Sequence, residues 1–240
     1  MAPPQDPYTP QTFEHDARWT AVDKYVTSHL HNTIPSPASL TATLTNSSTN
    51  GLPDIAVSAS QGKHLMLTAR LISAQRVLEV GTLGGYSTLW LASATPTTRV
   101  TSIEISPAHA AVAEESLQKA GVGERTEVLV GAGLDVLPKL AAEVQAGKRE
   151  KFDLVFIDAD KENNWAYADI AAGMSRSGAC LIVDNVVRKG ELANDKTEDE
   201  RVLGGRRVVE NVGKDPRLDA TVLQTVGEKN YDGFLFAVVK

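Results

Sequence analysis

The sequence predicts an α/β fold in which helices cover both faces of a doubly wound, mostly parallel sheet. From residue 61 onward, short apolar segments rich in β-branched residues alternate with helical stretches of about ten to fifteen residues. This alternation is typical of a parallel sheet buried on both faces. The chain then ends on two apolar segments separated by seven residues, too few for a parallel crossover. These last two strands are therefore expected to be antiparallel.

Each element follows from this pattern. The five predicted parallel strands are 76–80, 99–103, 126–130, 154–157 and 179–183. Right-handed crossovers between them give a Rossmann-like sheet. The C-terminal antiparallel hairpin, at 220–226 and 234–239, brings the sheet to seven strands. The clearest helices are expected at 61–73, 107–120, 163–174 and 197–214.

The N-terminal part differs in character, so residues 1–53 are interpreted as an extension with helices and residues 54–240 as the main domain. A helix is predicted at 19–31. Its apolar residues Val22, Tyr25, Val26 and Leu30 fall on one face. A second short helix is expected to end in the polar loop 46–51.

Composition excludes several classes of protein. The 240 residues are 42% apolar and 22% charged, an ordinary globular balance. A net charge of −6 without a long basic run disfavours nucleic-acid binding. No apolar run approaches the roughly 18 residues of a membrane span, and the start lacks the features of a signal peptide. Together with the lone Cys180, this predicts a cytoplasmic protein with no membrane partner.

A glycine-rich loop follows the first strand. Gly81, Gly84 and Gly85 allow a tight turn and close approach of a ligand, although the loop could be a simple strand-to-helix turn. Their spacing differs from the dinucleotide fingerprint, so a ligand without phosphate fits better. Glu104, at the end of the second strand and 23 residues beyond Gly81, can accept hydrogen bonds from ribose hydroxyls. Together they indicate an adenosine-type ligand.

A nicotinamide-dependent dehydrogenase is an alternative on such a fold. A common version of that chemistry uses a tyrosine with a lysine four residues later on one helix face. None of the five tyrosines of this chain has that lysine. The sequence therefore disfavours a dehydrogenase.

Polar residues follow the fourth and fifth strands. Asp158, Asp184 and Asn185 should meet at one sheet edge, and their oxygens suit a hard cation such as Mg²⁺. Because consecutive strand side chains point to opposite faces, the chain must bend after Asp184 for both neighbours to share an ion. Alternatively, these residues only begin loops. Lys161 is either a structural partner of an aspartate or a general base near the cation.

Four sequence pieces carry a resemblance to a known family. They are Glu79-Val-Gly-Thr-Leu-Gly-Gly-Tyr-Ser87, Phe152-Asp-Leu-Val-Phe-Ile-Asp-Ala-Asp-Lys161, Val183-Asp-Asn185 and Tyr231-Asp-Gly233. In this order and spacing, the chain from about residue 54 to 240 resembles the cation-dependent class I S-adenosylmethionine O-methyltransferases. It is most similar to the caffeoyl-CoA and catechol methyltransferase-like group.

The resemblance implies roles for individual residues. The implied metal ligands are Asp158, Asp184 and Asn185, for Mg²⁺ or alternatively Mn²⁺ or Ca²⁺. The implied cofactor contacts are Val57, Glu79, Gly81, Thr82, Ser87, Glu104, Gly133 and Asp160. Among these, Glu79 would meet the methionine amino group. Lys161 occupies the position of the proposed base, acting with Asp158. The resemblance also implies a homodimer, with the N-terminal region helping to form the substrate pocket.

The expected activity is methyl transfer from S-adenosylmethionine to a hydroxyl of a small catechol-type or related phenolic acceptor. Two alternatives stay open: a metal-independent methyltransferase of the same fold and a non-catalytic small-molecule binder. Where plant caffeoyl-CoA enzymes have a Trp-Asn-Gly stretch, this chain has Val-Val-Arg-Lys-Gly at 186–190, which argues against a caffeoyl-CoA acceptor. Arg188 and Lys189 are either a solvated turn or contacts for an acidic acceptor. Trp165 and Tyr167 either line the pocket or belong to the core.

Overall fold

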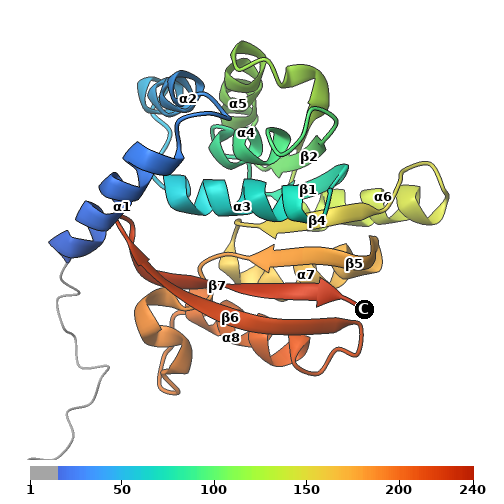
Figure 1. Ribbon diagram of the computed structural model, residues 1–240. Coiled ribbons are helices and arrows are strands. Elements are labelled where there is room, and N and C mark those ends of the chain that lie inside the picture. Colours follow the sequence, from blue (N-terminus) through green and yellow to red (C-terminus); the bar gives the residue numbers. More distant parts are fainter. Residues whose placement is uncertain (1–15) are drawn as a thin grey trace, which may run out of the picture.

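A seven-stranded sheet runs through the computed structural model, which describes residues 16–240 (Figure 1). The strands are β1 (Arg76–Val80), β2 (Arg99–Glu104), β3 (Thr126–Val130), β4 (Phe152–Ile157), β5 (Ser175–Val183), β6 (Leu218–Gly227) and β7 (Asn230–Val239). Their order in the sheet is β3-β2-β1-β4-β5-β7-β6. The part of the predicted N-terminal extension before residue 16 lies outside the described residues.

Strand pairing confirms the predicted architecture. β1 to β5 are parallel, whereas β7 is antiparallel to both β5 and β6. The hairpin is tighter than predicted, because its ladder continues until Gly227 pairs with Asn230. Two residues therefore connect the strands instead of seven.

Helices cover the two faces of the sheet separately (Figure 1). One face carries α3 (Ala59–Leu71), α4 (Tyr86–Ala92) and α5 (Pro107–Lys119), and the other carries α6 (Gly133–Gln145), α7 (Asn164–Gly173) and α8 (Glu200–Val212). Two N-terminal helices precede them, α1 (Ala17–Leu30) and α2 (Pro37–Thr49). Short 3₁₀ turns occur at η1 (Gly123–Arg125), η2 (Lys161–Asn163) and η3 (Arg188–Ala193).

The alternation of side chains along each strand divides the core into two layers. On β1, Val77 packs with the α3–α5 layer, whereas Leu78 and Val80 pack with the α6–α8 layer. Both sets are almost fully buried, as expected for central strands. Cys180 of β5 belongs to the α3–α5 layer, and its burial raises the thiol pKa to about 12, consistent with a packing role.

Two helices differ from the prediction. Helix α4 has seven residues instead of ten or more, since it begins after the left-handed Gly85 and ends just before a Thr-Pro turn. Helix α2 continues to Thr49 through most of the predicted 46–51 loop. The reason is that the Asn46 side chain donates to the Val112 carbonyl and contacts the Ser116 hydroxyl of α5, so this asparagine stabilises helix packing instead of a turn.

Helix α1 is formed as predicted, but most of its apolar face is exposed within the described chain, where the helix contacts β6 and α3. No residue of α1 is buried. Val22, Tyr25 and Leu30 are 60%, 67% and 63% exposed.

None of the helices within residues 16–240 combines the length and the apolar character that a membrane-spanning helix requires.

Candidate active site

A cavity of about 800 Å³ lies where β1, β2 and β4 end, the place where open α/β sheets bind ligands. Its volume falls within the range of roughly 300–1,000 Å³ typical of small-molecule sites. The predicted site residues that line it are Val57, Gly81, Thr82, Ser87, Glu104, Gly133, Asp158, Asp160, Lys161 and Asn185. Glu79 and Asp184 do not line the cavity, and both are buried.

The loop after β1 needs glycine for steric reasons. Gly81 has a φ of +101°, and a Cβ there would lie 2.1 Å from the carbonyl oxygen of Asp158. Gly85 has a φ of +84° and precedes α4. A side chain at position 81 could not pack against the end of β4, and one at position 85 would crowd Ala113 and Leu117 of α5 at 3.3 Å. The close packing brings the backbone of this loop to the cavity wall.

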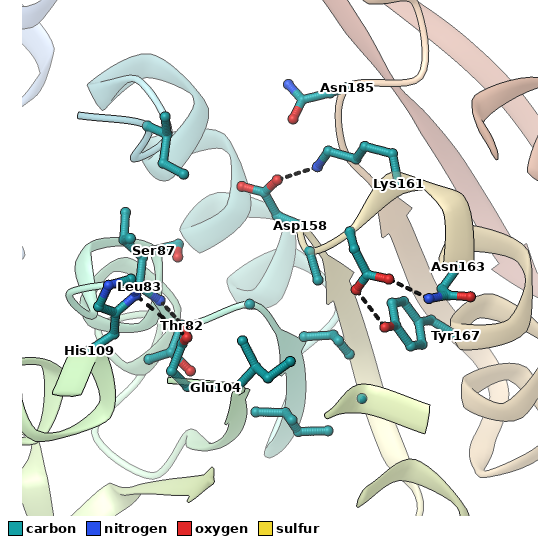
Figure 2. A pocket seen from close by; sticks show the side chains of 18 of the residues that line it. Thr82, Leu83, Ser87, Glu104, His109, Asp158, Lys161, Asn163, Tyr167 and Asn185 are labelled. Atoms are coloured by element: carbon teal, nitrogen blue, oxygen red, sulfur yellow. Dashed lines mark hydrogen bonds and ion pairs between the residues drawn. The ribbon is translucent and has the colours of Figure 1, made fainter. Parts of the chain in front are cut away.

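Glu104 is held in place by the backbone on two sides. One carboxylate oxygen accepts the Leu83 N–H at 2.8 Å (Figure 2). The other accepts the Ser106 N–H at 3.0 Å. The Nδ1 atom of His109 lies 3.6 Å from the same carboxylate and also lines the cavity. No pattern along the chain predicts a role for His109, because its position depends on how α5 packs. The remaining lone pairs of Glu104 are available to hydroxyl groups of a ligand.

Glu79 lies behind the cavity wall rather than on it. Its carboxylate accepts hydrogen bonds from the hydroxyls of Thr88 and Ser102, and a Ser87 hydroxyl also stabilises its charge. Ser102 in turn shares a hydrogen bond with Thr82. Burial raises the Glu79 pKa to about 7. Glu79 therefore supports two lining residues, Thr82 and Ser87, from below.

Asp160 is fixed by two side chains that follow it. The Tyr167 hydroxyl donates to one carboxylate oxygen at 2.6 Å, and the Asn163 amide donates to the other (Figure 2). The Tyr167 ring passes so close to Gly133 that a Cβ there would lie 2.7 Å from it. Tyr167 thus lines the cavity and also belongs to the buried core, whereas Trp165 only packs against the core.

The acidic residues gather at the neighbouring ends of β4 and β5. Lys161 Nζ donates to Asp158 Oδ1 at 2.6 Å, and Figure 2 shows the Asn185 amide pointing toward this pair. Strand β5 ends at Val183, and Asn185 has a φ of +55°, so the chain bends here as the shared-ion prediction requires. Asp184 Oδ1 accepts the Asn185 N–H at 2.8 Å, which keeps the two neighbours together.

Known proteins resemble this chain over nearly its whole length. A sequence profile described as "O-methyltransferase" matches residues 36–234. An O-methyltransferase of Aspergillus flavus, imqG, is 50% identical over 97% of this chain and 96% of its own. A catechol O-methyltransferase of Mycobacterium tuberculosis is 49% identical over 91% of this chain and 95% of its own.

The solved structures agree. An O-methyltransferase from Bacillus cereus, crystallised in complex with SAH, superposes with a TM-score of 0.87 at 45% identity. The match covers 93% of this chain and 99% of that one. This chain belongs to the O-methyltransferase family. The predicted resemblance is thereby confirmed at the level of family and fold.

Whether the acidic edge of this O-methyltransferase suits a metal ion depends on its donors. Within the described part of the chain, no three His, Cys, Asp or Glu side chains form a group that could hold a metal. The candidate set is instead two carboxylates, Asp158 and Asp184, with the amide of Asn185. Burial raises the pKa of Asp184, and the nearby charge of Asp158 raises it further, against the opposing effect of Lys161. The negative charge of these carboxylates is only partly offset by Lys161. Such a set of oxygen donors fits a hard divalent cation.

A second acidic residue organises the loop after β5. Asp232 of β7 accepts the Arg188 N–H at 2.8 Å with one oxygen and the Asn185 amide Nδ2 at 3.3 Å with the other. The Asn185 oxygen is then left for the cavity side. Asp232 lies in the Tyr-Asp-Gly piece of the sequence, but no pattern along the chain predicts its contact with a residue 47 positions away.

The two cations predicted at 188 and 189 separate in the structure. Arg188 lines the cavity, whereas Lys189 is exposed and does not line it. Both have left-handed backbone conformations, with φ of +52° and +59°. Arg201 of α8 also lines the cavity. The interpretation as a solvated turn thus describes Lys189 but not Arg188.

Proposed function

We propose that this O-methyltransferase transfers a methyl group from S-adenosylmethionine to a hydroxyl of a small catechol-type or related phenolic acceptor at a divalent cation. The observation that carries the proposal is that one cavity contains both Glu104 and the Asp158–Asn185 edge. A sulfonium donor and a hydroxyl acceptor can therefore meet without crossing the protein. The M. tuberculosis relative is named as a catechol enzyme, which supports this acceptor class.

The donor end of the cavity would hold the adenosine part of the cofactor. Glu104 would accept hydrogen bonds from the ribose hydroxyls, since its carboxylate already has a fixed orientation. Asp160 carries a negative charge at the cavity wall and suits the ammonium group of the methionine part. Glu79, because it lies behind the wall, would act through Thr82 and Ser87 and not by direct contact.

The acceptor end would hold and deprotonate the phenol. Asp158, Asp184 and Asn185 would ligate the cation, which when bound polarises the acceptor hydroxyls and orients them. Lys161 is the general base of the proposal, and its Nζ is already directed to this edge. In the transfer the acceptor oxygen forms a bond to the methyl carbon while the carbon–sulfur bond breaks toward sulfur. Holding both reactants in one cavity supplies much of the acceleration.

A metal-independent methyltransferase is the second candidate. The observation that favours it is the 2.6 Å ion pair between Lys161 and Asp158, which supplies a positive charge to this edge without a cation. In that case Lys161 would neutralise Asp158 instead of accepting a proton.

Chelation separates the two candidates. Purified protein is incubated with S-adenosylmethionine and a panel of vicinal diphenols, with methylated product measured by mass spectrometry before and after exhaustive treatment with EDTA. The proposal expects turnover to fall by at least about a hundredfold and to return when Mg²⁺ is added, because a catalytic cation supplies several kcal/mol. Full turnover after chelation would establish the metal-independent enzyme. Binding of S-adenosylmethionine without product from any diphenol would identify a non-catalytic binder.

The N-terminal region would contribute to the acceptor pocket and to a homodimer. Pro53, the last residue of the predicted N-terminal region, lines the cavity next to Ile55, Ala56 and Val57 of the main domain. The uncovered apolar residues of α1 offer a surface for a second copy, and sedimentation velocity would measure the resulting mass. The cytoplasmic location stays a prediction from composition.

A further inference from the structure

Arg188 is a cavity residue that the proposed chemistry leaves without a role. Its side chain lines the same cavity as Asn185, three residues before it. Its Nε atom is buried and has no hydrogen-bond partner among the described residues. A buried guanidinium N–H normally finds an acceptor, because a buried donor that lacks one is left without the hydrogen bond that water would supply.

The backbone of Arg188 is fixed although its side chain lacks a partner. Asp232 accepts its N–H at 2.8 Å and holds the left-handed turn at a φ of +52°. The same carboxylate contacts the amide of Asn185. Asp232 thus supports both Arg188 and Asn185. The position of Arg188 is therefore coupled to that of the acidic edge at Asn185.

The other arginine at the cavity is different. Arg201 donates from Nε and Nη2 to the two carboxylate oxygens of Asp199, at 3.0 and 2.6 Å. Its side chain is 58% exposed. Within residues 16–240 no carboxylate lies within 4 Å of the Arg188 guanidinium, although the charge of Arg188 does help to lower the pKa of Asp199. Arg188 is therefore the guanidinium with unused donors at this wall.

We infer that Arg188 binds a carboxylate group carried by the methyl acceptor, so that the acceptor is an aromatic acid with two adjacent hydroxyls; this rests on the proposed function. A guanidinium presents donors in a planar fork that matches a carboxylate. Three residues of chain place the Cα atoms of Asn185 and Arg188 within about 11 Å of each other. One ring can therefore present its hydroxyls to the acidic edge and its carboxylate to Arg188.

The test compares acceptors that differ only in charge. Methylation kinetics are measured with 3,4-dihydroxybenzoate, its methyl ester and 3,4-dihydroxybenzylamine. The wild-type enzyme is expected to show a KM for the acid about tenfold below that for the ester, and the amine is expected to be the weakest. In Arg188→Gln the KM for the acid rises about tenfold with kcat within about twofold, as expected for one lost charge-assisted hydrogen bond, while the ester is unaffected. Arg188→Lys restores part of the loss.

Lys189→Gln is the matched control. It removes one positive charge from the neighbouring left-handed position, but the side chain does not line the cavity. All three acceptors are expected to keep their wild-type KM values in this variant. A loss equal to that of Arg188→Gln would overturn the inference, because it would show a general charge effect. If Arg188→Gln folds poorly, the ratio of the KM values for acid and ester in the wild-type enzyme still tests whether the acceptor's carboxylate is bound.

Other outcomes are equally decisive. Equal KM values for acid and ester in the wild-type enzyme would overturn the inference while leaving the proposed function intact. A dependence on Arg188 seen only with a 3,4-dihydroxycinnamoyl thioester of coenzyme A would show that the anion is a phosphate, and so would also overturn it. Absence of product from every acceptor would instead overturn the proposed function, and the inference with it.

Discussion

The two ends of the cavity are built differently. At the donor end, Glu104 is fixed by the backbone N–H groups of Leu83 and Ser106, and glycines allow the β1 loop to pack closely. At the acceptor end, polar side chains are held mainly by one another. Lys161 contacts Asp158, and Asp232 contacts the amide of Asn185.

This difference separates a preformed region from one that depends on its ligand. Backbone donors around Glu104 are satisfied without a ligand. At the acidic edge the charge of the half-buried Asp158 opposes that of the buried Asp184, and burial raises the pKa of Asp184. The donor end is therefore expected to bind its ligand with little change, whereas the acceptor end needs added positive charge to be complete.

The largest expected effect comes from substitution at the acceptor end. Asp158→Ala removes one carboxylate ligand and the partner of Lys161. We expect methyl transfer to fall by about a thousandfold or more, equivalent to about 4 kcal/mol, because both the cation and the base lose their positions. The Kd for S-adenosylmethionine, measured by calorimetry, should stay within about threefold of wild type, a difference below 1 kcal/mol.

Glu104→Gln is the reciprocal change at the donor end. A glutamine would place an NH₂ group against one of the two backbone N–H donors, Leu83 or Ser106. The Kd for S-adenosylmethionine should rise about ten- to a hundredfold, with kcat at saturating cofactor nearly unchanged. If Asp158→Ala abolishes cofactor binding instead, the two ends are not independent and the comparison fails.

The two ends were also unequally predictable from sequence. Gly81 and Glu104 could be placed because each follows directly from where an apolar strand stops, and the local backbone then determines the rest. The bend at Asn185 could be stated as a condition for Asp184 and Asn185 to share an ion. In an unbent strand, consecutive side chains would point to opposite faces. These inferences depend only on neighbours along the chain.

Contacts between distant segments could not be predicted in this way. Asp232 reaches Asn185 only because β7 is inserted next to β5 in the sheet. Glu79 follows the strand pattern, yet the direction of its side chain depends on α4, from which Thr88 meets it behind the wall. The partnerless donor of Arg188 likewise depends on how η3 and α8 pack around the cavity.

A smaller effect is expected at Glu79, which supports the donor end from behind the cavity wall. The pKa of Glu79 is raised to about 7 from an ordinary 4.5 by burial. The folded cofactor-free protein then holds an extra proton on Glu79 between these values, so the contribution of Glu79 to stability is fully present below pH 4.5 and is lost as pH rises through about 7. The expected loss is up to about 3 kcal/mol. Glu79→Gln cannot titrate and should lack this part of the decline, as urea unfolding at successive pH values would measure. The part due to Asp184, whose pKa burial also raises to about 7, should be the same in both proteins.

An exposed glutamate provides the control for this pH dependence. Glu115 lies on α5, where Lys119 and Asn46 lower its pKa. Glu115→Gln should therefore not remove the decline in stability. If Glu79→Gln and wild type lose stability in parallel between pH 4.5 and 7, then Glu79 is already ionised in the folded protein, and the donor end tolerates a buried charge.

The smallest expected effect tests whether the donor end is held by backbone alone. Tyr167→Phe removes the hydrogen bond to Asp160 but keeps the ring against Gly133. Because Asp160 is exposed and retains its Asn163 partner, we expect a loss of about 1 kcal/mol, seen as an approximately fivefold higher Kd for S-adenosylmethionine. Tyr25→Phe, on the exposed face of α1, should change nothing. A hundredfold loss in Tyr167→Phe would mean that this side chain, and not the backbone around Glu104, is the main determinant of cofactor position.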